Sequence, residues 1–255
     1  MARAAIPGRL APRRWQIATV TARRAETATA STLCLRVEDW NGHLPGQHVD
    51  VRLTAPDGYQ AARSYSLAAP AAGGVDGVLE ITVQRLPDGE VSAFLTDDLV
   101  VGDRLELRGP LGNWFVWQQD DPAPVLLVAG GAGLVPLMSM IRARDRAHIP
   151  TPFRLIHSVR TPDDRIYADE LERLAAQPGG PSVTWLYTRT APQTDKRRPG
   201  RLRPNDLNDG SNWTLDAAPT CFVCGPTGFV EEASNHLLAA GHHANRIRTE
   251  RFGGR

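Results

Sequence analysis

The sequence is poor in cysteine, in net charge and in long apolar runs. Its three cysteines are too few for a disulfide framework, and an odd number fits a reducing compartment. The formal net charge of +1 gives no reason to expect bulk binding to nucleic acid. No run approaches the roughly 18 apolar residues that a membrane-spanning helix needs, and residues 1–13 lack the apolar centre of a signal peptide. These absences predict a soluble cytoplasmic protein with neither a nucleic-acid nor a membrane partner.

The small number of cysteines also argues against a metal centre. Cys221 and Cys224 form a C-x-x-C pair, a spacing found in zinc sites and in redox-active disulfides. A tetrahedral zinc site needs four ligands, and the sequence has no second pair. The same scarcity excludes an iron–sulfur cluster held by four cysteines of this chain. We interpret His43 and His48 as polar residues of a loop and of the strand after it, and we expect no metal site.

The hydrophobic pattern changes once along the chain. From about residue 14 to 117, apolar positions alternate in short runs separated by turn signals, which is typical of an antiparallel barrel or sandwich. After DDPAP (120–124), continuously apolar runs alternate with helical patterns, which predicts a parallel sheet covered on both faces. We therefore expect an N-terminal arm (1–13), an antiparallel β-barrel domain (14–118) and a Rossmann-like α/β domain (119–255).

A glycine-rich stretch, VAGGAGLVP (128–136), joins an apolar strand to a helix. Gly130, Gly131 and Gly133 permit a tight turn and close backbone approach, and Pro136 suits the first helical position. A pyrophosphate fits such a helix N-terminus, where free N–H groups and the helix dipole favour an anion. The alternative is a purely structural turn, but the strand–turn–helix context favours phosphate binding.

A strand of the first domain ends in RSYS (63–66). In a strand, Arg63 and Tyr65 point to one side and Ser66 to the other, so the segment can contact a ligand from two directions. Arginine offers a planar fork for a phosphate, tyrosine a flat apolar face, and serine a hydroxyl that can donate or accept. Taken alone, this segment would be an ordinary edge strand with a surface arginine.

Several motifs in a fixed order relate the chain to a known family. They are RSYSLA, GEVSAFL, RGPLGNWF, VAGGAGLVP, CFVCGP and TERFG. In this order they resemble the ferredoxin–NADP reductase superfamily over residues 14–254. The resemblance implies that the barrel holds a flavin, that the α/β domain binds a nicotinamide dinucleotide, and that the reaction occurs between them. It also implies a stand-alone member, because the fused iron–sulfur or haem domain of many relatives is absent.

The resemblance assigns roles to the flavin-side residues. It implies that Arg63 pairs with a flavin phosphate, that Tyr65 stacks on the isoalloxazine ring, and that Ser66 hydrogen-bonds near its N5 edge.

A second flavin motif follows in the same domain. Gly89, Val91 and Ser92 match a segment in which backbone N–H groups and a serine hydroxyl meet the diphosphate at the start of a short helix. A second phosphate contact favours FAD over FMN. The alternative here is a turn with an N-cap serine.

On the nicotinamide side, the protein must orient two rings and exclude water. Cys224, Gly225 and Pro226 end a parallel strand, where such sheets bind ligands. By resemblance, Cys224 packs beside the nicotinamide without acting as a nucleophile; the alternative is a buried apolar residue. Glu250 orients groups at the flavin edge or forms a surface salt bridge, and Phe252 replaces the tyrosine that covers the flavin in plant-type relatives. The candidate catalytic residues are Ser66, Cys224 and Glu250.

Three arginines bear on the choice of nicotinamide cofactor. Arg160 and Arg189 follow two strands, and Arg201 lies in the basic loop after the second. Related bacterial reductases have arginines at matching places that clasp the 2′-phosphate, so we expect NADPH. If these arginines only solvate the strand ends, NADH is the alternative.

The sequence therefore predicts an FAD-dependent NAD(P)H oxidoreductase. We expect it to accept a hydride from NADPH and to pass electrons singly to a separate iron–sulfur, haem or metal-containing protein. One alternative is a diaphorase or flavin reductase acting on small acceptors. An alternative of another class is a nucleotide-sensing binding protein without turnover, which the intact R-x-Y-S motif disfavours.

Overall fold

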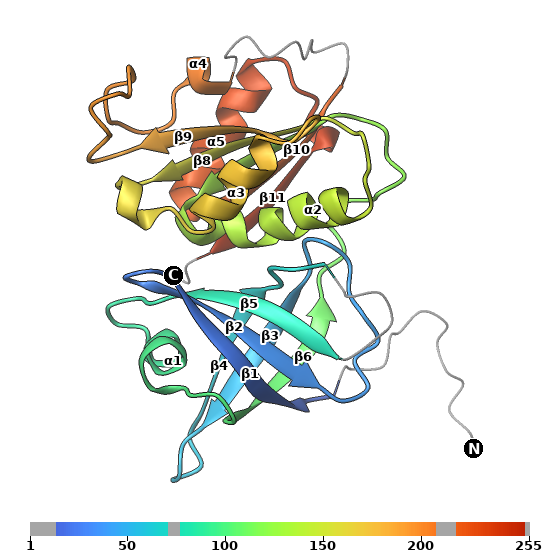
Figure 1. Cartoon of the computed structure of the whole chain (residues 1–255), viewed down its shortest axis with the longest axis vertical. Coiled ribbons are helices and arrows are strands. Elements are labelled where there is room, and N and C mark those ends of the chain that lie inside the picture. Colours follow the sequence, from blue (N-terminus) through green and yellow to red (C-terminus); the bar gives the residue numbers. More distant parts are fainter. Residues whose placement is uncertain (1–13, 71–76, 208–217, 253–255) are drawn as a thin grey trace, which may run out of the picture.

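The computed structural model describes residues 14–70, 77–207 and 218–252, and the expected N-terminal arm lies outside these residues. The chain forms two sheets, each the centre of one lobe (Figure 1). The first sheet is antiparallel and the second parallel, as the change in hydrophobic pattern predicts. Among the described residues, no helix is long and apolar enough to cross a membrane.

The antiparallel sheet has six strands in the order β4-β3-β6-β1-β2-β5. Its two edge strands approach each other through a bridge between Leu67 and Ile81 and a hydrogen bond from the Ala68 N–H to the Glu80 carbonyl oxygen, 2.7 Å long. This contact closes the sheet into a barrel. The strands are β1 (Gln16–Thr27), β2 (Ala30–Val37), β3 (His48–Thr54), β4 (Gln60–Ser66), β5 (Val78–Gln84) and β6 (Arg104–Leu111).

Alternating apolar side chains fill the barrel interior. In β3, for example, Val49 and Val51 are fully buried, while Asp50 between them is only partly covered. The short helix α1 (Glu90–Ala93) adds Val91 to this core, and the π-helical turn η1 (Phe94–Asp98) adds Leu95. The turn that carries the second predicted flavin motif is thus fixed to the barrel by its own apolar residue.

The parallel sheet has five strands in the order β11-β10-β7-β8-β9. The strands are β7 (Val125–Gly130), β8 (Phe153–Val159), β9 (Ser182–Tyr187), β10 (Thr220–Pro226) and β11 (Ile247–Phe252). The connecting elements are η2 (Gly131–Gly133), α2 (Leu134–Arg146), η3 (Pro162–Asp164), α3 (Ala168–Ala175), α4 (Pro204–Leu207), α5 (Thr227–Ala239) and η5 (Ala244–Arg246). From β7 the chain builds outward to β9, and it then returns to place β10 on the other side of β7. This reversal creates a crevice at the carboxyl ends of β7 and β10, where sheets of this kind bind ligands.

Helices cover both faces of the parallel sheet. Residues of α2 and α3 share one core cluster, and residues of α5 share the other. Cys224 belongs to the first cluster and Cys221 to the second. Because the two cysteines are three positions apart on one strand, they point to opposite faces of the sheet. They therefore cannot form a disulfide or ligate one metal ion, and no cluster of potential metal ligands occurs among the described residues.

Polar contacts join the two lobes. The Arg142 guanidinium, from α2, lies 2.7 Å from Glu80 of β5 and 2.6 Å from Glu170 of α3. The Tyr167 hydroxyl at the start of α3 hydrogen-bonds to Thr82 of β5. These contacts hold α2 and α3 against the barrel.

Candidate functional site

A cleft of about 760 Å³ lies between the barrel and the carboxyl ends of the parallel strands. Its walls come from β3, β4, β5 and the α1 turn on one side, and from the ends of β7, β8, β10 and β11 on the other. This volume suits a large organic ligand. The cleft brings together most of the residues that the sequence singled out in both domains.

The R-x-Y-S segment forms one wall. Arg63, Tyr65 and Ser66 all line the cleft, with Arg63 exposed, Tyr65 half-buried and Ser66 buried. Burial raises the pKa of Tyr65 to about 12, although the nearby Arg63 charge opposes the shift. The tyrosine therefore stays a neutral ring with a polar tip at physiological pH.

Two buried polar atoms in the cleft have no partner among the described residues. They are the Ser66 hydroxyl oxygen and Oε2 of Glu250. An unpaired buried polar group costs free energy, so it is a good position for a ligand that supplies the missing hydrogen bond. These atoms fit a flavin ring edge, which carries both donors and acceptors.

The α1 turn also borders the cleft, through Gly89, Val91 and Ser92. The Ser92 hydroxyl donates to the Gly89 carbonyl oxygen at 3.0 Å and accepts the Leu86 N–H at 3.1 Å. Its single donor is thus used within the turn, which differs from the expected contact between this hydroxyl and a diphosphate. Gly89 has no room for a side chain, because a Cβ would lie 2.3 Å from the Ser92 Oγ.

The glycine-rich turn faces the R-x-Y-S wall from the other domain. Gly130 and Gly131 line the cleft, whereas Gly133 lies behind them. A Cβ on Gly133 would lie 2.1 Å from the Cys224 carbonyl oxygen, so glycine allows the turn to approach β10 closely. Helix α2 begins at Leu134, so Pro136 is the third helical residue and not the first. It still fits, because N–H groups of the first turn have no intrahelical partner.

The C-G-P segment contributes less to the cleft than expected. Pro226 lines it, but Cys224 and Gly225 do not, and Cys224 is fully buried in the core cluster beneath α2. Burial and the neighbouring Glu250 carboxylate raise the pKa of the Cys224 thiol well above its ordinary value. The thiol is therefore neutral, and in this structure it does not face the cleft. Phe252, which lines the cleft, packs against the same core cluster.

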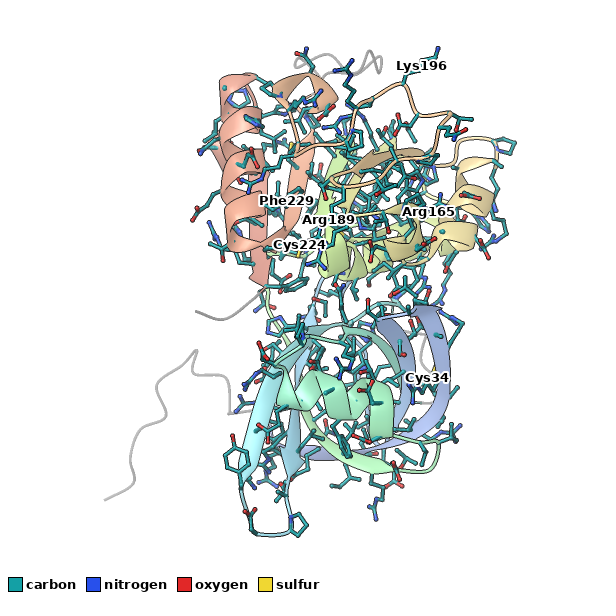
Figure 2. All side chains as sticks on the ribbon, turned by 90° about the vertical axis from the view of Figure 1, so that its left-hand side faces the viewer. Cys34, Arg165, Arg189, Lys196, Cys224 and Phe229 are labelled. Carbon is teal, nitrogen blue, oxygen red and sulfur yellow. The ribbon has the colours of Figure 1, made fainter. Side chains whose placement is uncertain are left out.

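The three arginines expected at the 2′-phosphate lie near one edge of the sheet. Arg160 lines the cleft, and its carbonyl oxygen accepts the Arg189 N–H at 2.9 Å. The loop that carries Arg201 is held to the end of β9 by a 3.0 Å hydrogen bond from the Gly200 N–H to the Tyr187 carbonyl oxygen. None of the three guanidinium groups has a hydrogen-bond or ion-pair partner among the described residues. Figure 2 places Arg189 nearer the barrel than Lys196 of the same loop region.

Glu250 forms a pair that the sequence reading did not predict. Its Oε1 lies 3.7 Å from Nδ1 of His48, and both residues line the cleft. Burial raises the pKa of Glu250 to about 7 and lowers that of His48. His48 lies at the cleft because β3 pairs with β4, which places His48 opposite Ser66. A single sequence does not show which strands pair, so this role of His48 was missed. Other lining residues that were missed are Thr82, Gln84, Ser158, Thr188, Phe229 and Arg251.

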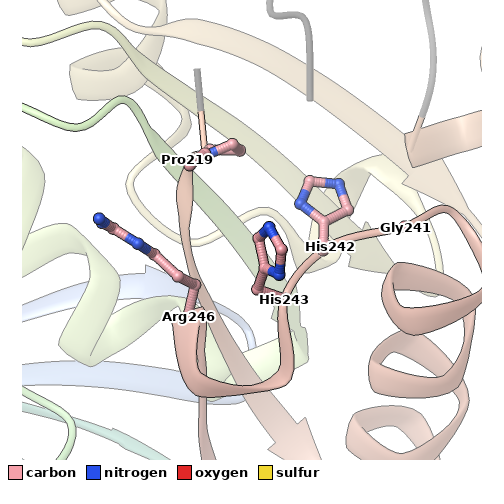
Figure 3. Close-up of a pocket in the computed structure, with 6 residues that line it drawn as sticks. Pro219, Gly241, His242, His243 and Arg246 are labelled. Atoms are coloured by element: carbon pink, nitrogen blue, oxygen red, sulfur yellow. The ribbon is translucent and has the colours of Figure 1, made fainter. Parts of the chain in front are cut away.

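A second hollow lies at the opposite end of the parallel strands, before β10 and β11 begin (Figure 3). Pro219, His242, His243 and Arg246 line it, and Sγ of the buried Cys221 lies 3.4 Å from Nδ1 of His242. Burial raises the pKa of this thiol to about 12. The hollow has no space for a bound small molecule. It therefore does not compete with the cleft as a functional site.

Comparison with known families assigns both lobes. Residues 18–116 match the oxidoreductase FAD-binding domain, and residues 127–235 match the oxidoreductase NAD-binding domain. The chain is 32% identical over 235 residues to an NADPH oxidoreductase of Mycobacterium tuberculosis. That alignment covers 90% of this chain and 58% of the relative, so the chain spans less than two thirds of the relative's length.

Solved structures give the same assignment. The ferredoxin reductase in carbazole 1,9a-dioxygenase superposes with a TM-score of 0.80 at 26% identity, over 97% of this chain and 71% of that one. The Amycolatopsis cytochrome P450 reductase GcoB has a TM-score of 0.79 at 28% identity, over 96% of this chain and 72% of that one. The fold and the matched domains define an oxidoreductase with one domain for FAD and one for a nicotinamide dinucleotide. The chain belongs to the ferredoxin reductase family.

Proposed function

We propose that this protein takes a hydride from NADPH and passes electrons one at a time to a separate redox protein. The observation that carries the proposal is the cleft that both domains line, with an unpaired Ser66 atom on the barrel side and, on the α/β side, an unpaired Glu250 atom and the glycine-rich turn. FAD, when bound, supplies the chemistry, because a flavin accepts a hydride and releases electrons singly. The residues of this chain bind the two cofactors, orient them toward each other and shield them from water.

The barrel wall binds the flavin. Arg63 offers a charged fork to a phosphate, and Tyr65 offers a neutral ring face. Ser66 satisfies its buried hydroxyl on the ring edge. The N–H groups at the α1 turn hold the diphosphate, which favours FAD over FMN.

The α/β wall binds the nicotinamide cofactor. Gly130 and Gly131 let the pyrophosphate approach the N-terminus of α2, where the helix dipole favours an anion. Arg160, Arg189 and Arg201 meet a 2′-phosphate, and their guanidinium groups have no described protein partner, which favours NADPH over NADH. Phe252 shields the flavin edge in the cleft, beside Pro226 at the end of β10.

The acceptor is a separate protein with a one-electron centre. Relatives with this fold are named as the ferredoxin reductase in a carbazole dioxygenase and as a cytochrome P450 reductase. The first name pairs the reductase with a dioxygenase, and the second pairs it with a cytochrome P450. We therefore propose an iron–sulfur or haem protein of an oxygenase system as the acceptor, in preference to a small-molecule acceptor such as free flavin.

An anaerobic titration tests the proposal. The visible spectrum of the purified protein, reconstituted with FAD, is recorded before and after one equivalent of NADPH, and separately of NADH. We expect a flavin band that bleaches faster with NADPH. Protein that stays colourless with FAD would refute the flavin site, and faster bleaching with NADH would refute the role of the three arginines.

A further inference from the structure

A buried histidine lies directly behind the glycine-rich turn. His157 is in the middle of β8, is fully buried, and pairs in register with Ala129 of β7. Its Nε2 lies 2.9 Å from the Gly131 carbonyl oxygen. No step of the proposed function uses this side chain, and a polar residue at the centre of a parallel sheet needs an explanation.

The hydrogen-bond partner determines the tautomer of this histidine. A carbonyl oxygen can only accept, so Nε2 carries the proton. Nδ1 is then an acceptor, and it has no donor among the described residues. Burial lowers the pKa of His157 to about 4, so the ring stays neutral at physiological pH. Trp185, the register partner of His157 on β9, contacts the ring at a centroid distance of 5.2 Å and limits its rotation.

The geometry of the peptide bond carries this contact to the cleft. Carbonyl and N–H of one trans peptide point in opposite directions. Because His157 draws the Gly131 carbonyl toward the sheet, the N–H of Ala132 in the same peptide points away from it, and Ala132 lines the cleft. Gly131 has a φ of 53°, a conformation that glycine adopts without strain. The Leu134 N–H also meets the Gly131 carbonyl oxygen as it closes the 3₁₀ turn, so His157 adds a side-chain donor to a peptide that one backbone contact already holds.

We propose that His157 is a positioning residue for the dinucleotide pyrophosphate: its Nε2–H holds the Gly131–Ala132 peptide so that the Ala132 N–H faces the anion. The inference rests on the proposed binding of a nicotinamide dinucleotide in the cleft. His157 is proposed to affect binding of the pyrophosphate alone. The 2′-phosphate of the adenosine is instead proposed to meet the arginines at the other end of the site.

This separation gives a sharp test. Dissociation constants are measured by calorimetry on the FAD-loaded protein for NADP⁺ and NAD⁺, which carry the pyrophosphate, and for adenosine 2′-phosphate, which does not. His157→Phe keeps a ring of similar size without the donor, and His157→Gln replaces the donor at a similar reach. The dinucleotide that the wild type binds should bind about tenfold more weakly to H157F, because one hydrogen bond is lost. We expect less than a twofold change for adenosine 2′-phosphate, and recovery to within threefold in H157Q.

Other outcomes overturn the inference. Equal weakening of the dinucleotide and of adenosine 2′-phosphate in H157F would show general loosening of the domain, and unchanged dinucleotide binding would show that the peptide needs no support. A wild type that binds neither dinucleotide would refute the proposed function itself. If H157F does not fold, nitrogen NMR of wild-type protein labelled at histidine decides: a proton on Nδ1 of His157 would overturn the inference.

Discussion

Arg142 and Glu80 connect the two domains: the guanidinium on α2 lies 2.7 Å from the carboxylate on β5, across the interface beside the cleft. The same guanidinium also binds Glu170 and the Ala68 carbonyl oxygen. Both carboxylates raise the pKa of Arg142 against the opposing effect of burial. One arginine therefore neutralises two acidic groups, one from each domain.

Removal of this arginine should destabilise the protein. Arg142→Met leaves Glu80 and Glu170, whose side chains are 19% and 27% exposed, without their cation. We expect a loss of about 2–4 kcal/mol in the free energy of unfolding, measured with urea. Arg173→Met, at an exposed position of α3, is the matched control and should change stability by less than about 0.5 kcal/mol. Equal losses in the two variants would contradict a specific interdomain role.

Glu250 should make stability fall as pH rises. In the unfolded chain it ionises near its ordinary pKa of about 4.3, but in the folded protein only near pH 7. The folded protein therefore binds more protons between these values. The stability from the protonated carboxyl is complete below pH of about 4.3 and is lost as pH rises through 7.

Glu250→Gln removes this dependence. Urea unfolding at several pH values should show E250Q gaining on the wild type by about 3 kcal/mol between pH 4 and pH 8. Glu231→Gln, at an exposed position on α5, should show no such trend. Parallel stability curves for E250Q and wild type would mean that Glu250 ionises normally.

Arg63 should matter for flavin binding. Arg63→Ala removes the charged fork in the cleft wall, so we expect the dissociation constant for FAD to rise by roughly 10- to 100-fold, measured by fluorescence of released flavin. Arg63→Lys should recover only part of the affinity, because an ammonium group lacks the planar fork. Arg36→Ala, on the exposed side of β2, is the control. Full flavin content in R63A would place the phosphate elsewhere.

The arginines at the sheet edge should discriminate between the two nicotinamide cofactors. In Arg160→Ala with Arg189→Ala, we expect KM for NADPH to rise about 10- to 100-fold and KM for NADH to change less than threefold, since NADH lacks the 2′-phosphate. Steady-state rates with ferricyanide as acceptor measure both. A similar rise for both cofactors would remove the argument for NADPH.

The two strand cysteines should be unreactive in the native protein. Burial raises the pKa of both thiols, and only the thiolate is nucleophilic. Iodoacetamide at pH 8, followed by mass spectrometry, should leave Cys221 and Cys224 unlabelled and label the partly exposed Cys34 slowly. All three should react in urea. A disulfide-linked peptide containing both strand cysteines would contradict their placement on opposite faces.

Most of the fold was predictable from local pattern, and part of the site was not. The change from alternating to continuous apolar runs predicted both sheets correctly. A strand buried on one face alternates apolar and polar residues, whereas a strand buried on both faces is apolar throughout. Strand β11 was not predicted: Ile247 is its only buried residue, and its charged residues obscure the alternation of a strand. The sequence predicted that the helix begins at Pro136, but α2 begins two residues earlier, at Leu134, directly after a 3₁₀ turn.

The misses in the site share one physical cause. His48 and Glu250 meet because β3 and β11 belong to different sheets that face the same cleft, and no local pattern records that. Likewise, Ser92 carries the expected residue type, but its hydroxyl closes its own turn. Residue type and strand position were predictable, whereas the direction of a donor depends on tertiary contacts.

Helix α2 has contacts at both of its ends that constrain its length. It begins at the glycine-rich turn, and eight residues later it carries Arg142, which binds the barrel. Inserting one residue between them would rotate Arg142 by about 100° and shift it by about 1.5 Å relative to the turn. Such an insertion would leave every local motif readable in the sequence and still break the ion pair between the two domains. Homologues that keep this ion pair should therefore vary in their surface loops but not in the spacing from Leu134 to Arg142.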